Sequence, residues 1–243
     1  MNRSIDPFAF SPPSSARAVG AASYDEGLRR HMLGVYRNMA MGLGITALVA
    51  LLIASTPALY QPIFGTPLKW VAILAPLAFV LFFSFRVDRM TTEQARTAFY
   101  AFAAVMGVSM ASIFLLFTGT SIAMAFFSAA AVFAGISLWG YTTDVDLSRW
   151  TTFLMVGLIG VVIASLINLF VGSSTLQLVF SVVGVLVFTG LTAWDTQRLK
   201  SEYLAYAGAE PADKLAVMGA LSLYLNLINL FQLLLNMFGQ RQE

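Results

Sequence analysis

Long apolar segments alternate with short polar connections along most of this chain. A helix that crosses the hydrocarbon core of a bilayer needs about 20 mostly apolar residues. Segments near that length are Met39–Ser55, Trp70–Phe85, Thr97–Phe117, Ser121–Tyr141, Thr152–Val171, Leu176–Trp194 and Leu215–Phe238. The pattern therefore predicts an all-α fold, a bundle of seven transmembrane helices. The count depends most on Trp70–Phe85, which is short and contains Pro76.

The connections between these segments are short and rich in turn-forming residues. Residues 1–27 contain Pro7, Pro12 and Pro13 and no apolar stretch as long as that of a secretory signal. We therefore expect residues 1–27 to form a disordered cytoplasmic tail and residues 28–243 to form a single transmembrane domain.

The basic residues predict how the bundle is oriented. With seven spans, all but two of the 14 Lys and Arg residues fall on the side of the N-terminus, and the two exceptions are Lys69 and Arg241. Positive charge accumulates on the cytoplasmic side of membrane proteins. The expected topology is thus a cytoplasmic N-terminus and an external C-terminus.

Composition excludes several classes of function. Only 11% of the residues are charged, compared with roughly 25% in soluble domains. The chain has no cysteine and a single histidine, His31, outside the predicted spans, so thiolate and zinc sites are excluded. Basic residues are scattered between apolar runs, which argues against nucleic acid as a partner. Hydrolysis within the membrane would need a nucleophile with a base, or two paired acids, at the same depth in the bilayer. The sequence offers no such combination, so we expect no enzyme activity.

Polar residues within the last two spans form two stripes. At 100° per residue, each set falls within an arc of roughly 140° or less. The stripes consist of Ser181, Thr189, Thr192, Asp195 and Thr196 on the sixth span, and Ser222, Asn226, Asn229, Gln232 and Asn236 on the seventh. Polar groups facing lipid would be unpaired, so we expect the stripes to face each other or a shared cavity.

Asp195 is the one carboxylate placed within, or at the edge of, an apolar span. Such a residue is a candidate functional site. Two simpler interpretations stay open. Asp195 precedes Arg198 by three residues, so the two could form an ordinary ion pair at the headgroups, and the amides of the seventh span could be hydrogen bonds between helices.

Two stretches carry a resemblance to a known family. TGLTAWDTQRLK at Thr189–Lys200 and GALSLYLNLINLFQLLLNMFG at Gly219–Gly239 resemble the Bax inhibitor-1 family, whose bacterial members include YccA-like membrane proteins. The resemblance implies that the seventh helix is central, surrounded by the other six. It also implies a pH-sensitive latch, in which aspartates on the sixth and seventh helices share a proton.

The chain departs from the family pattern at that latch. Asp195 matches the first aspartate, but Asn226, which does not ionise, occupies the second position. Burial favours the neutral form of Asp195 and an amide donor favours the charged form, and the sequence leaves open which prevails. Some family members carry a basic residue late in the seventh helix, where this chain has Asn236. The remaining candidate basic partners of Asp195 are Arg86, Arg89 and Arg198.

These observations support two functional hypotheses. The first is a passive, pH-modulated leak for calcium or protons, with Asp195 as a transient calcium site and no resident cofactor. One carboxylate with nearby amides and hydroxyls is fewer ligands than the six to eight oxygens of a stable calcium site. The alternative is a non-conducting regulator that binds another membrane protein through the tail. The resemblance implies a membrane-bound quality-control protease as that partner, since some bacterial relatives are associated with one. Both hypotheses place the chain in a lipid bilayer.

Overall fold

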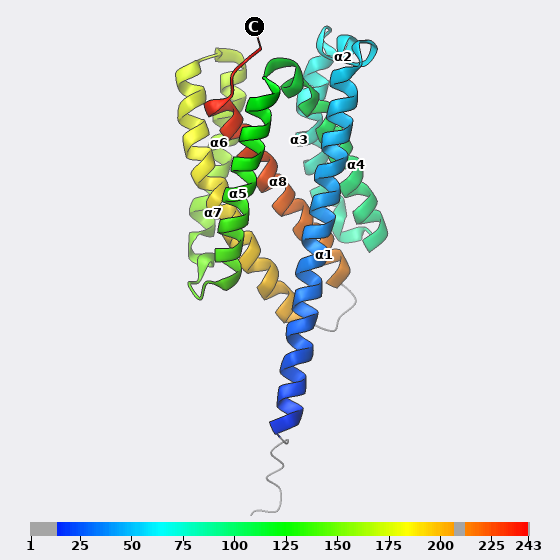
Figure 1. The fold of residues 1–243 in the computed structure, drawn as a ribbon, viewed down its shortest axis with the longest axis vertical. Coiled ribbons are helices and arrows are strands. Elements are labelled where there is room, and N and C mark those ends of the chain that lie inside the picture. Colours follow the sequence, from blue (N-terminus) through cyan, green and yellow to red (C-terminus); the bar gives the residue numbers. More distant parts are fainter. Residues whose placement is uncertain (1–13, 207–211, 243) are drawn as a thin grey trace, which may run out of the picture.

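The structure is a computed structural model that describes residues 14–206 and 212–242, and within these ranges it is helical with no β-strand (Figure 1). The long helices are α1 (Ser14–Ser55), α3 (Leu68–Arg86), α4 (Thr92–Leu116), α5 (Gly119–Thr142), α6 (Thr151–Val171), α7 (Ser174–Tyr206) and α8 (Ala212–Phe238). The shorter elements are α2 (Pro57–Phe64) and the 3₁₀ turns η1 (Val87–Arg89) and η2 (Leu147–Trp150).

The predicted all-α bundle of seven spans is confirmed. Seven helices in the described part of the chain are long and apolar enough to cross a membrane. Pro76 lies inside α3 without ending the helix, so Trp70–Phe85 does count as a span. The short helix α2 follows α1 in one of the connections that the sequence indicated as short and rich in turn-forming residues. Pro57 begins it, because proline lacks the N–H that the first residue of a helix leaves unpaired anyway.

Two helices extend well beyond their predicted apolar segments. α7 continues past Trp194 to Tyr206, because Asp195, Arg198 and Glu202 are spaced to form ion pairs along one helix face. α1 begins at Ser14, so residues 14–27 of the expected disordered tail are helical, which suits their alanine-rich sequence. Residues 1–13 lie outside the described residues.

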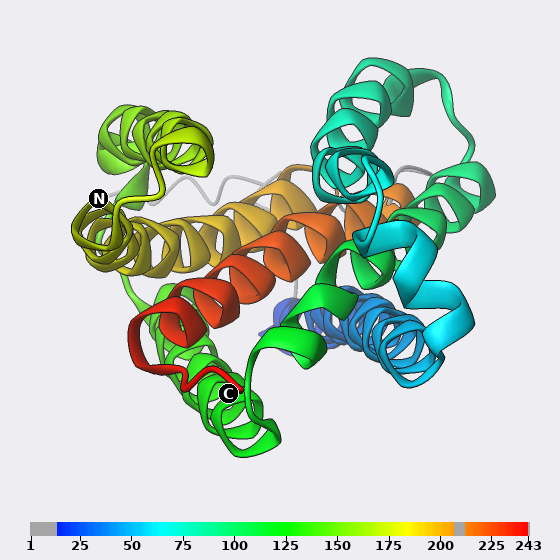
Figure 2. The ribbon, with the colours of Figure 1, turned by 90° about the horizontal axis from the view of Figure 1, so that it is seen from above.

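α8 is the most buried of the seven spans. Within the most apolar window of each helix, 61% of α8 is buried, compared with 17% of α3 and 11% of α6. α8 packs against α1, α4, α5 and α7, whereas α3 packs on α4 and α6 packs on α7. Figure 2 shows α8 crossing the bundle between α7 and the pair α1 and α4. Enclosure of α8 by all six other spans stays a prediction.

Glycines set the closest approaches between helices. A Cβ atom at Gly140 of α5 would overlap the carbonyl oxygen of Ala193 in α7. A Cβ at Gly107 of α4 would similarly meet the backbone of Thr46 in α1. Small residues let helix backbones pack closely in lipid, where interhelical contact rests on van der Waals packing and hydrogen bonds. The residues next to Asp195 are thus held by backbone contact between α5 and α7.

Candidate functional site

Asp195 and Asn226 meet across the hairpin formed by α7 and α8. The Nδ2 atom of Asn226 donates a hydrogen bond of 2.7 Å to Oδ2 of Asp195. The contact is possible because both helices continue well past these residues toward the 207–211 connection, by comparable lengths. In an antiparallel pair with arms of similar length, residues at equal distance from the connection lie side by side. The two polar stripes therefore face each other at this level.

The carboxylate of Asp195 is buried and has a partner on each oxygen. Its side chain is 7% exposed, and Nη2 of Arg198 lies 3.0 Å from Oδ1. A buried charge is tolerated only when it is paired and hydrogen-bonded. Here Arg198 supplies the opposite charge and Asn226 supplies a neutral hydrogen-bond donor. The negative charge of Asp195 is therefore compensated within the protein.

Arg198 connects the buried acid to the end of α7. Its Nε lies 3.4 Å from Oε1 of Glu202, and its Nη2 donates to Oγ of Ser222 at 3.4 Å. The guanidinium also lies over the Trp194 ring, 4.8 Å from the centroid, and the side chain is one-third exposed. We refer to Asp195, Arg198, Glu202, Ser222 and Asn226 as the Asp195 cluster.

The other candidate partners lie elsewhere. Arg86 and Arg89 are on the connection between α3 and α4, and Arg86 lies over the Phe82 ring at 5.7 Å. Within residues 14–206 and 212–242, no ion pair joins either arginine to Asp195. Thr192 is fully buried and donates to the carbonyl of Phe188 in its own helix at 2.7 Å.

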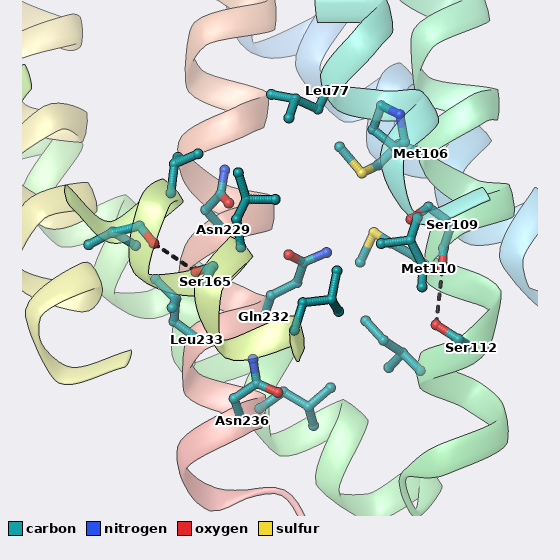
Figure 3. Close-up of a pocket in the computed structure, with 18 of the residues that line it drawn as sticks. Leu77, Met106, Ser109, Met110, Ser112, Ser165, Asn229, Gln232, Leu233 and Asn236 are labelled. Carbon is teal, nitrogen blue, oxygen red and sulfur yellow. Dashed lines mark hydrogen bonds between the residues drawn. The ribbon is translucent and has the colours of Figure 1, made fainter. Parts of the chain in front are cut away.

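The rest of the stripe on α8 lines a cavity of about 520 Å³, which we call the amide pocket. Asn229, Gln232 and Asn236 project into it from α8, and Gln232 reaches toward Ser109 and Met110 of α4 (Figure 3). Asn229 also donates to the carbonyl of Leu225 at 2.7 Å. The remaining walls come from α3, α4, α6 and α7 and include Leu77, Met106, Ser112, Ser165 and Phe188.

The Asp195 cluster and the amide pocket are adjacent along α8. Asn226 belongs to the first and Asn229 lines the second, and three residues of helix rise roughly 4.5 Å. One face of α8 thus carries polar side chains from the buried carboxylate to a cavity of neutral amides and hydroxyls. Such groups offer oxygen and N–H dipoles without fixed charge.

Two buried hydroxyl contacts were not anticipated from the sequence. Tyr224 Oη and Thr46 Oγ1 are 2.6 Å apart, and Thr46 donates to the carbonyl of Ala103 at 2.8 Å. Ser137 Oγ lies 2.6 Å from Tyr36 Oη and 2.9 Å from Thr196 Oγ1, joining α1, α5 and α7. Of these residues only Thr196 lay on a stripe that the sequence indicated. The other hydroxyls stand singly in separate apolar runs and gave no periodic signal, so only their meeting in the fold identifies the contacts.

The cluster provides few ligands for a metal ion. In the described part of the chain, no three His, Cys, Asp or Glu side chains gather as a metal-binding group. One carboxylate, already paired with Arg198, is far from the six to eight oxygens of a stable calcium site. A cation at Asp195 would have to be a passing one that competes with Arg198.

Comparison with known proteins covers nearly the whole chain. Residues 28–243 match the family described as inhibitor of apoptosis-promoting Bax1. An uncharacterized protein of Rickettsia prowazekii is 42% identical over 91% of this chain and 94% of its own length. An uncharacterized protein of Caulobacter vibrioides is 41% identical, over 91% and 92%. The inner membrane protein YbhL of Escherichia coli is 38% identical, over 89% and 94%.

Proposed function

Because the chain belongs to the Bax inhibitor-1 family and is a membrane protein with seven spans, we propose that it is a passive, pH-modulated cation leak. Calcium or protons are the permeant ions, and the bacterial inner membrane is the location, as for the relative YbhL, an inner membrane protein. The N-terminus is cytoplasmic, as the distribution of Lys and Arg favours.

The observation that carries the proposal is the 2.7 Å hydrogen bond between Asn226 and the buried carboxylate of Asp195. It links α7 to α8 at one end of the polar face that continues into the amide pocket. Ionisable groups inside transmembrane bundles mark ion and proton pathways. Asp195 binds the passing cation, and the amides and hydroxyls of the pocket replace part of its hydration.

Arg198 acts in this scheme as a tethered cation. Nη2 of its guanidinium lies 3.0 Å from Oδ1 of Asp195. A permeant cation would bind at the same oxygen. Glu202 and Ser222 offer Arg198 other partners at 3.4 Å, so it leaves the carboxylate without losing all of its contacts. Protonation of Asp195 removes the charge that holds Arg198, which makes the leak depend on pH.

The test is calcium flux into proteoliposomes across a range of pH. Replacing Asp195 with Asn removes the one carboxylate of the path, so Asp195→Asn should lower flux about tenfold, the equivalent of losing one charged hydrogen bond. It should also abolish the pH dependence. The control is Asp144→Asn, which neutralises an exposed carboxylate on the α5–α6 connection. Wild-type flux equal to that of protein-free vesicles at every pH would reject the leak.

The alternative function is a non-conducting regulator that binds a membrane protease. One observation favours it, since Figure 1 shows the N-terminal end of α1 extending beyond the rest of the bundle. Exposed chain ends are accessible to partners. Co-purification from native membranes, with and without residues 1–27, distinguishes the two. A stoichiometric partner that is lost with this segment, together with no flux from the isolated protein, would favour the regulator.

A further inference from the structure

A cavity separate from the amide pocket lies between α1 and α5. It has a volume of about 420 Å³, and we call it the α1–α5 groove. Met32 and Phe133, each 5% exposed, form its floor, and Leu33 and Leu138, more than half exposed, form its rims. In a bundle that spans the membrane, an apolar groove of this kind faces the acyl chains of lipids.

Acyl chains alone do not explain selectivity for a particular lipid. Lipid tails are as apolar as leucine side chains, so transferring one from the bilayer into an apolar groove gains little beyond packing. What distinguishes one lipid from another at such a groove is therefore the chemistry at the end where its headgroup lies.

One end of the α1–α5 groove is basic. Arg29 lines it, and Arg29 and Arg30 share a single acid, Glu26, at 3.5 and 3.1 Å. Both arginine side chains are at least 70% exposed, so most of their N–H donors face outward. Tyr141 closes the same end from α5, and the Lys200 ammonium lies 5.1 Å from the centroid of its ring.

We propose that the α1–α5 groove binds an anionic phospholipid, with an acyl chain between Leu33 and Leu138 and the phosphate against Arg29. Basic pockets between transmembrane helices bind anionic headgroups. Among the described side chains, Arg29 and Arg30 at this end share the single acid Glu26, and Lys200 adds a positive charge beside Tyr141. This site is distinct from the Asp195 cluster, and it stands whether or not the protein conducts ions.

Another cavity, apolar and nearer the other ends of α1 and α5, provides an internal comparison. It has a similar volume, about 510 Å³, and is lined by residues of α1, α4, α5 and α8 that include Leu43, Ala47, Phe127 and Phe231. Among the described residues, none of those lining it is charged. It should accept any acyl chain, so selectivity for anionic lipid arises from the Arg29 end alone.

The experiment is native mass spectrometry of the full-length protein in detergent. The probes are phosphatidylglycerol and phosphatidylcholine with identical acyl chains. Wild-type protein should retain phosphatidylglycerol in preference to phosphatidylcholine. The preference should fall about fivefold for each arginine removed in Arg29→Ala and in the double variant with Arg30→Ala. Binding of phosphatidylcholine should not change.

Two further variants separate the groove from general charge. Arg149→Ala removes a basic residue from η2 that is 85% exposed and pairs with Asp146, and it should leave the preference intact. Ala134→Trp places an indole in the groove and should reduce binding of both lipids. Equal binding of the two lipids by wild type, equal effects of Arg149→Ala and Arg29→Ala, or full lipid binding by Ala134→Trp would each overturn the proposal.

Discussion

At the scale of single residues, Arg198 gives the buried carboxylate a cation from its own helix. The spacing of three residues in the sequence allowed this ion pair, and the structure places it at 3.0 Å. The simple interpretation, an ordinary headgroup pair, does not account for the burial of Asp195 or for its bond to Asn226. The acid of the pair is therefore buried, whereas its base is one-third exposed and also contacts Ser222 of α8.

Removing Arg198 should increase the leak. Arg198→Gln takes away the tethered cation that competes for Asp195 and keeps a side chain of similar reach. We expect calcium flux to rise about tenfold, because one charge-assisted hydrogen bond no longer opposes cation entry. Flux into proteoliposomes measures this, with Arg149→Gln as the control for loss of a distant positive charge. Unchanged or lower flux, with the thermal unfolding temperature preserved, would contradict the role given to Arg198.

Asn226→Asp should make the leak more sensitive to pH. The substitution puts a second carboxyl where the amide now donates at 2.7 Å. Two carboxyls at this distance do not both ionise, so they share one proton, and its loss produces repulsion between α7 and α8. The ratio of flux at high and low pH should exceed that of wild type. An identical pH profile in the two proteins would show that residue 226 does not act on the path.

At the scale of helices, the continuation of α7 past its apolar segment brings the site together. A hydropathy criterion ended this helix at Trp194, whereas the structure continues it to Tyr206. The residues in between are polar, yet their ion pairs at helical spacing stabilise the same helix. Without that continuation, Asn226 would lie too far along α8 to reach Asp195.

The contact between α5 and α7 should be sensitive to side-chain size. Gly140→Leu places a branched side chain against the Ala193 backbone, and overpacking of this kind costs about 1–3 kcal/mol. Thermal unfolding in detergent should show a clear decrease in midpoint. Gly135→Leu is the matched control on the same helix, because a Cβ there meets no atom of another helix within 4 Å. Similar midpoints for the two variants would mean that this contact contributes little.

At the scale of the whole molecule, the positive-inside rule predicts opposite locations for two ends of the bundle. The natural chain has no cysteine, so single cysteines report topology directly. Gln240→Cys, beside the α4–α5 turn, should react with a membrane-impermeant maleimide in intact cells. Ser148→Cys, on the exposed α5–α6 connection, should react only after permeabilisation. The reverse pattern would invert the orientation proposed above.

The sequence by itself determined that the chain lies in a bilayer, how many times it spans the bilayer, and which residue types form the site. Runs of apolar residues require a bilayer, and Asp195 was identifiable because a lone carboxylate in such a run is costly. The motifs at Thr189–Lys200 and Gly219–Gly239 are enough to indicate the family to which residues 28–243 belong. These are local properties, readable from composition and helical period.

Only the tertiary structure decided which polar groups are partners. In the fold, the partner of Asp195 is Arg198 rather than Arg86 or Arg89. Tyr224 contacts Thr46, and the side chains of Asn229, Gln232 and Asn236 line one cavity. The α1–α5 groove likewise appears only when Arg29 and Tyr141 are brought together. The physical reason is that contacts between helices depend on their lengths, rotations and crossing points, and these are set by packing of the whole bundle rather than by any one segment.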